Sequence, residues 1–243
     1  MAANKYYEEL YASGNMINAT EGDSGIFYRH PKCRDLFLNH FPDLECNSVL
    51  ELGAGEGQIF ELIQKHIHNN YASYTLTESS QNAIKRLNDK FSKHKNTIVR
   101  ELDVTARFPF TDNCFDIVCC FNLMHHITPA PAAQHMANEM MRVSKKHVFL
   151  IEANGISIIR RIGELPRQAR ELGESSYAPW KYKNFFLNAG AESVEITPWY
   201  FLMPPNIKKN HLKPFITVSE FGAKIPLLKW QSQSLEIYCE KAK

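Results

Sequence analysis

The sequence predicts an α/β fold built on a doubly wound, mainly parallel sheet. Apolar strand-like segments alternate with segments of helical spacing from residue 46 to about residue 155, and the first strand leads directly into a glycine-rich turn. This alternation is typical of βαβ units, in which right-handed crossovers place helices on both faces of the sheet. The length of 243 residues corresponds to one domain with a single core.

The strands and helices of this core follow one another in the order that a βαβ fold requires. The five strand candidates are short apolar segments: 48–52, 71–77, 97–102, 115–121 and 147–151. Apolar residues at helical spacing predict helices over 59–67 and 83–91. Another helix follows the fourth strand, with Thr128 as its N-cap, Pro129 in its first turn and an apolar face that extends to Met141.

The pattern changes on both sides of this core. Residues 1–45 read as a helical segment rich in aromatic residues. Beyond residue 155, we predict a helix over 179–189, closed by Gly190, and strands over 193–196 and 234–239. The stretch between these two strands is too long for an ordinary hairpin loop, and insertions of this kind are usually functional or disordered.

Composition and charge argue against several classes of protein. The chain has 28 Lys and Arg against 26 Asp and Glu, and a net charge of +2 is too small to indicate nucleic acid or an anionic membrane surface. No stretch of about 18 apolar residues predicts a membrane span. Lys5, Glu8 and Glu9 stand where a signal peptide would have its apolar core, so we expect a cytoplasmic protein. Its six cysteines lack metal-ligand spacing and are expected to be reduced.

The most informative segment is the turn that follows the first strand. It contains Gly53, Gly55 and Gly57, and a helix begins directly after it. Glycines permit a tight turn and let ligand atoms approach the backbone, and ligands of open parallel sheets bind beyond the carboxyl ends of the strands. The dinucleotide fingerprint G-x-G-x-x-G would need glycine at position 58, which is Gln58 here.

Polar residues stand at the ends of the next three strands. Glu78 ends the second strand and can accept hydrogen bonds from both hydroxyls of a ribose. Asp103, followed by Val104, ends the third strand, where a carboxylate and a backbone N–H can meet an adenine. Asn122 follows the fourth strand. Each has an ordinary alternative role, such as a helix-dipole partner or a loop carboxylate, but together they predict one ligand crevice.

This pattern resembles the class I S-adenosylmethionine-dependent methyltransferases, in particular the broad ubiquinone-type and natural-product group that acts on small molecules. The family's acid followed by G-x-G-x-G matches Glu51 and the three glycines of the turn, and residues 115–127 are similar to its fourth strand and following loop. Glu78 departs from the commoner aspartate. The resemblance implies a Rossmann-like, seven-stranded sheet with an antiparallel last strand.

The resemblance also implies S-adenosylmethionine as the methyl donor and S-adenosylhomocysteine as the product. The residues that it implies for donor binding are Tyr11, Arg29, Glu51, Gly53, Ala54, Gly55, Gly57, Glu78, Ser79, Asp103, Val104 and Asn122. The methionine part would lie near Gly53 and Asn122, and the ribose on Glu78. Arg29 is a candidate partner for the donor carboxylate, and an exposed arginine is the ordinary alternative.

We expect one methyltransferase domain in four parts: an N-terminal cap over 1–45, a donor-binding core over 46–155, an acceptor lid with the sixth strand over 156–230, and the last strand over 231–243. Aromatic residues of the lid are candidates for an apolar acceptor pocket, although aromatics at helical spacing are more often core residues: Trp180, Tyr182, Phe185, Phe186, Trp199, Tyr200 and Phe201. A solvated helix face is the better interpretation of Arg160, Arg161, Arg167 and Arg170, although an anionic acceptor would also suit them.

Methyl transfer is an in-line displacement that sometimes needs a general base. His125 and His126, just after the fourth strand, are the candidate bases, although such a pair can also simply pack or order the loop. Magnesium-dependent relatives carry a carboxylate where this chain has Asn122, so we expect no metal. The predicted function is methylation of a small organic acceptor on O, N or C, without nucleic acid. The alternatives are a non-catalytic donor-binding module with a partner protein, or other chemistry with the donor.

Overall fold

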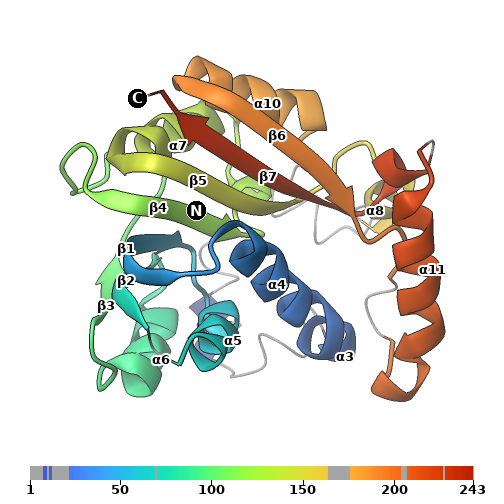
Figure 1. Cartoon of the computed structure of the whole chain (residues 1–243), viewed down its shortest axis with the longest axis horizontal. Coiled ribbons are helices and arrows are strands. Elements are labelled where there is room, and N and C mark those ends of the chain that lie inside the picture. Colours follow the sequence, from blue (N-terminus) through green and yellow to red (C-terminus); the bar gives the residue numbers. More distant parts are fainter. Residues whose placement is uncertain are drawn as a thin grey trace.

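The computed structural model describes residues 8–9, 11–12, 22–68, 70–163, 176–203, 207–226 and 228–242. A seven-stranded sheet in the order β3-β2-β1-β4-β5-β7-β6 runs through it (Figure 1). Strands β1 to β5 are parallel, and β7 is antiparallel to both of its neighbours, β5 and β6. The predicted Rossmann-like fold with an antiparallel last strand is therefore confirmed.

The strands lie where the apolar segments predicted them. Their bounds are β1 Leu44–Leu52, β2 Tyr71–Glu78, β3 Thr97–Glu101, β4 Phe115–Phe121, β5 Ser144–Ala153, β6 Ala191–Trp199 and β7 Ser234–Lys241. The apolar run of β4 has the predicted bounds. β1 begins four residues before the predicted residue 48, and its register with β2 shifts between Leu44 and Ser48.

Helices cover both faces of the sheet (Figure 1). Side chains of α4 (His30–His40), α5 (Gln58–His66) and α6 (Gln81–Phe91) belong to the core cluster on one face. Side chains of α7 (Ala130–Val143) and α10 (Pro179–Asn188) belong to the cluster on the other. Ahead of α4 lie the short α3 (Gly22–Ser24) and the π-helical η1 (Gly25–Arg29).

The predicted N-cap of α7 is wrong by one residue. Pro129 is the N-cap, with an extended backbone (φ −74°, ψ 175°), and the helix begins at Ala130. Thr128 would cap the helix only if Pro129 had helical dihedral angles, which it does not have. The predicted end of α10 is correct, because Gly190 follows it with φ +90°.

The region between β6 and β7 contains a helix that sequence reasoning missed. α11 (Leu212–Lys224) is 13 residues long and stands beyond the ends of β6 and β7, at the right of Figure 1. Short 3-10 turns η3 (Lys209–His211) and η4 (Lys229–Gln231) flank it. Next after β5 in the chain, the short helix α8 (Ile158–Gly163) begins the predicted lid. Arg167 and Arg170 lie outside the described residues.

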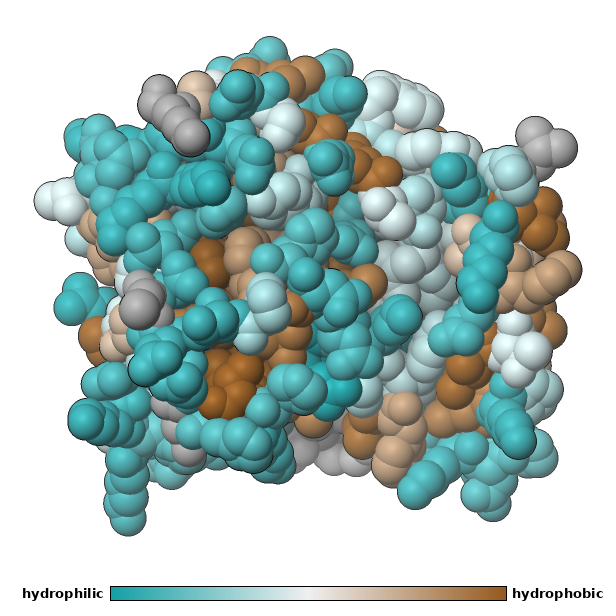
Figure 2. Space-filling view, in the orientation of Figure 1, coloured by the Kyte–Doolittle hydropathy of each residue, from teal (hydrophilic) through white to brown (hydrophobic). Residues whose placement is uncertain are grey.

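Hydrophilic residues cover most of the surface seen in Figure 2, with hydrophobic residues in separate patches. None of the helices in the described ranges is long and apolar enough to span a membrane. Five of the six cysteines, all those with described side chains, are free: Cys33, Cys114, Cys119, Cys120 and Cys239.

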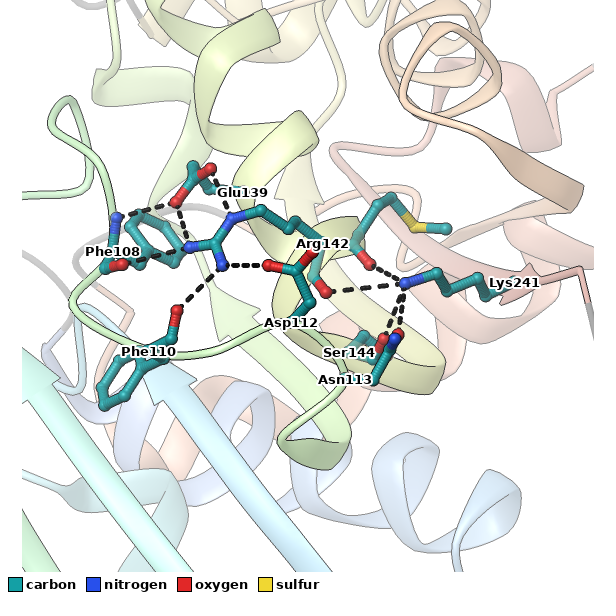
Figure 3. A network of polar contacts seen from close by, with 9 residues as sticks. Phe108, Phe110, Asp112, Asn113, Glu139, Arg142, Ser144 and Lys241 are labelled. Atoms are coloured by element: carbon teal, nitrogen blue, oxygen red, sulfur yellow. Dashed lines mark hydrogen bonds and ion pairs between the residues drawn. The ribbon is translucent and has the colours of Figure 1, made fainter.

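A polar network fixes the long connection between β3 and β4 to α7 (Figure 3). Arg142 donates to the carbonyl oxygens of Phe108 and Phe110 at 3.0 and 2.8 Å, and its guanidinium pairs with Glu139 and Asp112. Glu139 in turn accepts from the backbone N–H of Phe108 at 2.7 Å. Because this connection begins with Asp103, the network stabilises one wall of the predicted crevice.

Candidate functional site

The glycine turn between β1 and α5 has the backbone that its sequence requires. Gly53, Gly55 and Gly57 have φ values of +62°, +59° and +76°, in the left-handed region that favours glycine. A Cβ atom on Gly53 would lie 2.8 Å from Leu123 Cδ1, and one on Gly57 would clash with the ring of Phe91. Backbone conformation therefore disfavours larger residues at both positions, and at Gly57 the ring of Phe91 also leaves no space for a Cβ.

Glu78 is joined directly to this turn. Its carboxylate accepts from the backbone N–H of Gly55 at 3.1 Å and from that of Ser79 at 2.8 Å. Burial raises the pKa of Glu78, while the hydrogen bonds from Ser79 and Gly55 oppose the rise. Two residues 23 positions apart in the sequence thus meet at the carboxyl ends of β1 and β2, as the sequence predicted.

Asp103 stands beside Glu78 at the edge of the same crevice. The backbone N–H of Leu102 donates to the carbonyl of Glu78 at 3.0 Å, which holds the ends of β2 and β3 together. The carboxylate of Asp103 is exposed and accepts from the N–H and hydroxyl of Thr105 at 2.8 and 2.7 Å. Val104, next to it, is buried and supplies apolar surface.

Tyr11 and Glu8, two of the described residues near the N-terminus, lie close to the glycine turn and the start of α6. Tyr11 is buried, and its hydroxyl is 3.3 Å from the position that a Cβ on Gly55 would take. Arg86 of α6 donates to the carbonyl of Tyr11 at 2.6 Å, and Glu8 accepts from the N–H of Gln81 at 2.8 Å. These contacts place Tyr11 within reach of a molecule bound at the turn.

The side chain of Glu51 is turned into the interior of the fold. It is 2% exposed, and its carboxyl accepts from the hydroxyl of Tyr74 on β2 at 2.8 Å. Burial raises the pKa of Glu51 to about 8, so this acid is mainly protonated at neutral pH. The structure therefore does not bring its carboxyl group to those of Glu78 and Asp103.

The segment after β4 is built around a buried acid that sequence reasoning missed. Glu152 of β5 is fully buried, and its carboxylate accepts from the N–H groups of Leu123 and Met124 at 2.9 and 2.6 Å. It also contacts His125 Nδ1 at 2.8 Å. Asn122, which begins this segment, has φ +58° and donates its N–H to Ile151 at 2.7 Å. An acid near the end of a strongly apolar strand was the available signal.

The two histidines lie in different surroundings. His125 is 4% exposed and His126 is half-buried, with their ring centroids 4.0 Å apart. Burial lowers the pKa of His125 to about 4; His126 and Arg160 act in the same direction, and Glu152 opposes them. For Glu152, burial would raise the pKa, but the bonds from His125 and the loop hold it below its usual value. At neutral pH the pair is thus a carboxylate and a neutral imidazole.

A small cavity opens beside this segment. It is lined by Arg29, Cys33, Asn122, Ala153, Arg160, Trp199, Tyr200, Gln233 and Ser234. These residues come from η1, α4, α8 and the ends of β4, β5, β6 and β7, so the cavity lies beyond the carboxyl ends of the central strands. Arg29, predicted at the donor site, therefore shares this cavity with Asn122.

The aromatic residues proposed for the acceptor pocket separate into three groups. Tyr182, Phe185 and Phe186 are core residues packed with α7, so their assignment to a pocket is wrong. Their spacing on α10 was that of a helix face buried against the sheet. Trp180 is 61% exposed. Trp199 and Tyr200 do line the cavity.

No group of three or more His, Cys, Asp or Glu residues within the described ranges is arranged to hold a metal ion. The arrangement brings the glycine turn and Glu78 together at the carboxyl ends of β1 and β2, and it places a neutral histidine held by a carboxylate in the segment after β4.

Comparison with known proteins agrees with this arrangement. Residues 49–147 match the family model described as a methyltransferase domain. The highly reducing polyketide synthase ctvA of Aspergillus terreus is 29% identical over 140 residues, which are 54% of this chain and 6% of the synthase. The chain therefore spans only a small part of the length of the curated relatives that it matches.

Two solved structures share the fold over nearly the whole chain. One is a chain of the complex between the Haloferax volcanii Trm112 methyltransferase activator and a methyltransferase, with a TM-score of 0.68, 14% identity and 98% coverage of both chains. The other is the CurJ carbon methyltransferase, with a TM-score of 0.65, 15% identity, and coverage of 96% of this chain and 58% of that one. At these identities the likeness shows the fold.

The fold, the family match over residues 49–147 and the glycine turn with its acidic partner thus all point to a methyltransferase domain. Residues 49–147 carry this likeness to a methyltransferase domain. The methyl donor of the family is S-adenosylmethionine.

Proposed function

We propose that the protein transfers the methyl group of S-adenosylmethionine to a small organic acceptor, with His125 as the general base. The observation that carries the proposal is the contact between Gly55 and Glu78 at the carboxyl ends of β1 and β2, with the His125–Glu152 pair at the same edge of the sheet. The glycine turn with Glu78 suits a nucleoside, and the His125–Glu152 pair suits removal of a proton from an acceptor.

The described residues fit the donor. The left-handed glycines leave backbone open at Gly55, where a Cβ would have only Tyr11 and Gln58 within 4 Å. Glu78 would accept from the ribose hydroxyls, with Ser79 beside it, and Asp103 and Val104 would meet the adenine. Gly53, Ala54, Asn122, Tyr11 and Arg29 would surround the methionine part. The carboxyl group of Glu51 accepts a hydrogen bond from Tyr74 in the interior. Glu51 would therefore support the glycine turn through its position on β1 and would not contact the donor with its side chain.

The bound donor supplies a methyl group that is already activated by a positively charged sulfur. The protein has to align the acceptor with this methyl, exclude water and remove a proton where the acceptor carries one. With Nδ1 of His125 donating to Glu152, its Nε2 has a free lone pair that can accept that proton. The carboxylate of Glu152 would then stabilise the imidazolium that forms.

Incubation with donor labelled in the methyl group and a small-molecule extract tests the proposal. Label should enter the small-molecule fraction, and a His125→Ala variant should lose most of this transfer while a His126→Ala variant keeps more of it. Donor binding without any transfer of label would contradict the proposal and favour a binding module. Label in protein or RNA would contradict the small-molecule acceptor.

A further inference from the structure

The cavity beyond β4, β5 and β7 has the lining of an anion site. Two guanidinium groups reach it from different elements, Arg29 from η1 and Arg160 from α8. No residue of its described lining is acidic. A cavity lined by two cationic residues and no carboxylate favours a negatively charged occupant.

Trp199 adds a hydrogen-bond donor that the protein itself does not use. Its side chain lines the cavity and is 6% exposed, and its indole Nε1 is buried without a partner among the described residues. An indole N–H can only donate. A buried donor left without an acceptor costs free energy, so a ligand atom that accepts from it would gain that energy on binding.

Two of the neighbouring polar side chains are hydrogen-bonded within the protein. Gln233 Oε1 accepts from the N–H of Met203 at 2.9 Å, and the hydroxyl of Ser234 donates to the carbonyl of Glu152 at 3.0 Å. With two guanidinium groups, the unused indole N–H of Trp199 and no carboxylate, the lining is positively charged. Carboxylate and phosphate oxygens, which only accept, match this lining.

The position of Arg160 connects this cavity to the proposed chemistry. The positive charge of Arg160 contributes to lowering the pKa of His125, which places the guanidinium within electrostatic range of the proposed base. Because Arg29 is proposed for the donor carboxylate, Arg160 and Trp199 remain for the acceptor.

We infer that the acceptor carries an anionic group, a carboxylate or a phosphate, that binds between Arg160 and the indole N–H of Trp199, apart from the atom that is methylated. This inference rests on the proposed function, since it names the class of acceptor for the same site.

The chain allows a direct optical test. It has three tryptophans, and Trp180 and Trp230 are the other two. A Trp180→Phe/Trp230→Phe protein therefore reports on Trp199 alone. This protein, saturated with S-adenosylhomocysteine, is titrated with sodium acetate and with sodium phosphate at constant ionic strength, with sodium chloride as the reference.

We expect a saturable change in Trp199 emission with acetate or phosphate and none with chloride. Arg160→Gln in the same background should weaken binding at least tenfold, and Arg161→Gln, an exposed neighbour on α8, should change it less than twofold. The absence of a saturable response, an equal response to chloride, or an equal response in Arg160→Gln would overturn the inference.

Two further measurements separate this inference from the proposed function. The labelled product of the transfer experiment should be retained on an anion-exchange resin at pH 8, and a labelled product that passes through would overturn the anionic acceptor alone. Calorimetry with S-adenosylhomocysteine tests the donor site independently. If the product does not bind, the proposed function fails whatever the anions do; if it binds and the anions do not, only the inference fails.

Discussion

The replacement Glu152→Gln tests whether the buried acid of β5 both holds the loop after β4 and orients the base. The carboxylate has four nitrogen donors around it, two on each oxygen: the N–H groups of Leu123 and Met124 on Oε1, and the N–H and Nδ1 of His125 on Oε2. A glutamine has the same shape, but its NH2 group cannot accept a hydrogen bond.

Two of the four donors therefore lose their acceptor, whichever way the amide is turned. A buried group left unsatisfied costs about 1–3 kcal/mol, so the free energy of unfolding should fall by roughly 2–6 kcal/mol. In a chain of this length that lowers Tm by roughly 5–20 °C. Since a positioned general base contributes about 10²–10⁴-fold, transfer of label should fall at least 100-fold.

The assays are thermal unfolding, calorimetry with S-adenosylhomocysteine, and transfer of label from the donor. Affinity for S-adenosylhomocysteine should change less than threefold, because Glu152 makes none of the proposed donor contacts. Asp116→Asn is the control: this acid at the start of β4 accepts from Ser48 and Lys145, at the opposite end of the strand from the site. It should lose stability and keep its transfer rate. Transfer by Glu152→Gln within threefold of the wild-type rate would refute the positioning role.

Three further substitutions test other parts of the account. Gly57→Ala should lower the free energy of unfolding by more than about 2 kcal/mol and weaken donor binding. The reason is that a φ of +76° costs an alanine roughly 1–2 kcal/mol and that the added carbon has no room beside Phe91. Gly190→Ala is the control: with φ +90° and open space, it should show only the backbone cost in chemical unfolding. Arg142→Gln should cost about 3 kcal/mol, because it leaves the buried carboxylate of Glu139 unpaired, and a Tm within 2 °C of wild type would contradict this. Burial raises the pKa of Glu51 in the folded protein to about 8, above its ordinary value of 4.5, so the native state holds the extra proton and stability should fall as pH rises from 6.5 to 8. Glu51→Gln should remove this slope of up to about 1.4 kcal/mol per pH unit, and an unchanged slope in urea titrations would count against it.

The sequence predicted the parts of the fold that depend on local pattern. The apolar run of β4 and the glycine turn after β1 are determined by residues next to one another, and both were found where expected. α11 was missed because Pro214, the β-branched Ile216–Val218 and Gly222 all weaken its helical pattern, and burial of its face against Phe201 compensates only in the folded chain.

For the candidate site, the sequence predicted only the residues that stand at the ends of strands. Glu78 and the turn could be joined in advance, because the ends of neighbouring parallel strands lie together. Glu152 could not be linked to His125 from the sequence, because the segment between them, with a sequence separation of 27, gives no sign of which loop the buried acid would hold. The division of the lid aromatics into core and cavity likewise depends on how α10 and β6 pack.

The central claim is that the donor binds at the glycine turn with its sugar on Glu78. Calorimetry with S-adenosylhomocysteine on the wild-type protein and on Glu78→Gln tests it most directly, with Glu101→Gln, an exposed acid at the end of β3, as the control. We predict saturable binding by the wild type and the control, and an affinity at least tenfold lower in Glu78→Gln, a loss of about 1.4 kcal/mol or more. No heat of binding in the wild type at millimolar ligand, or equal affinity in Glu78→Gln, would contradict the account.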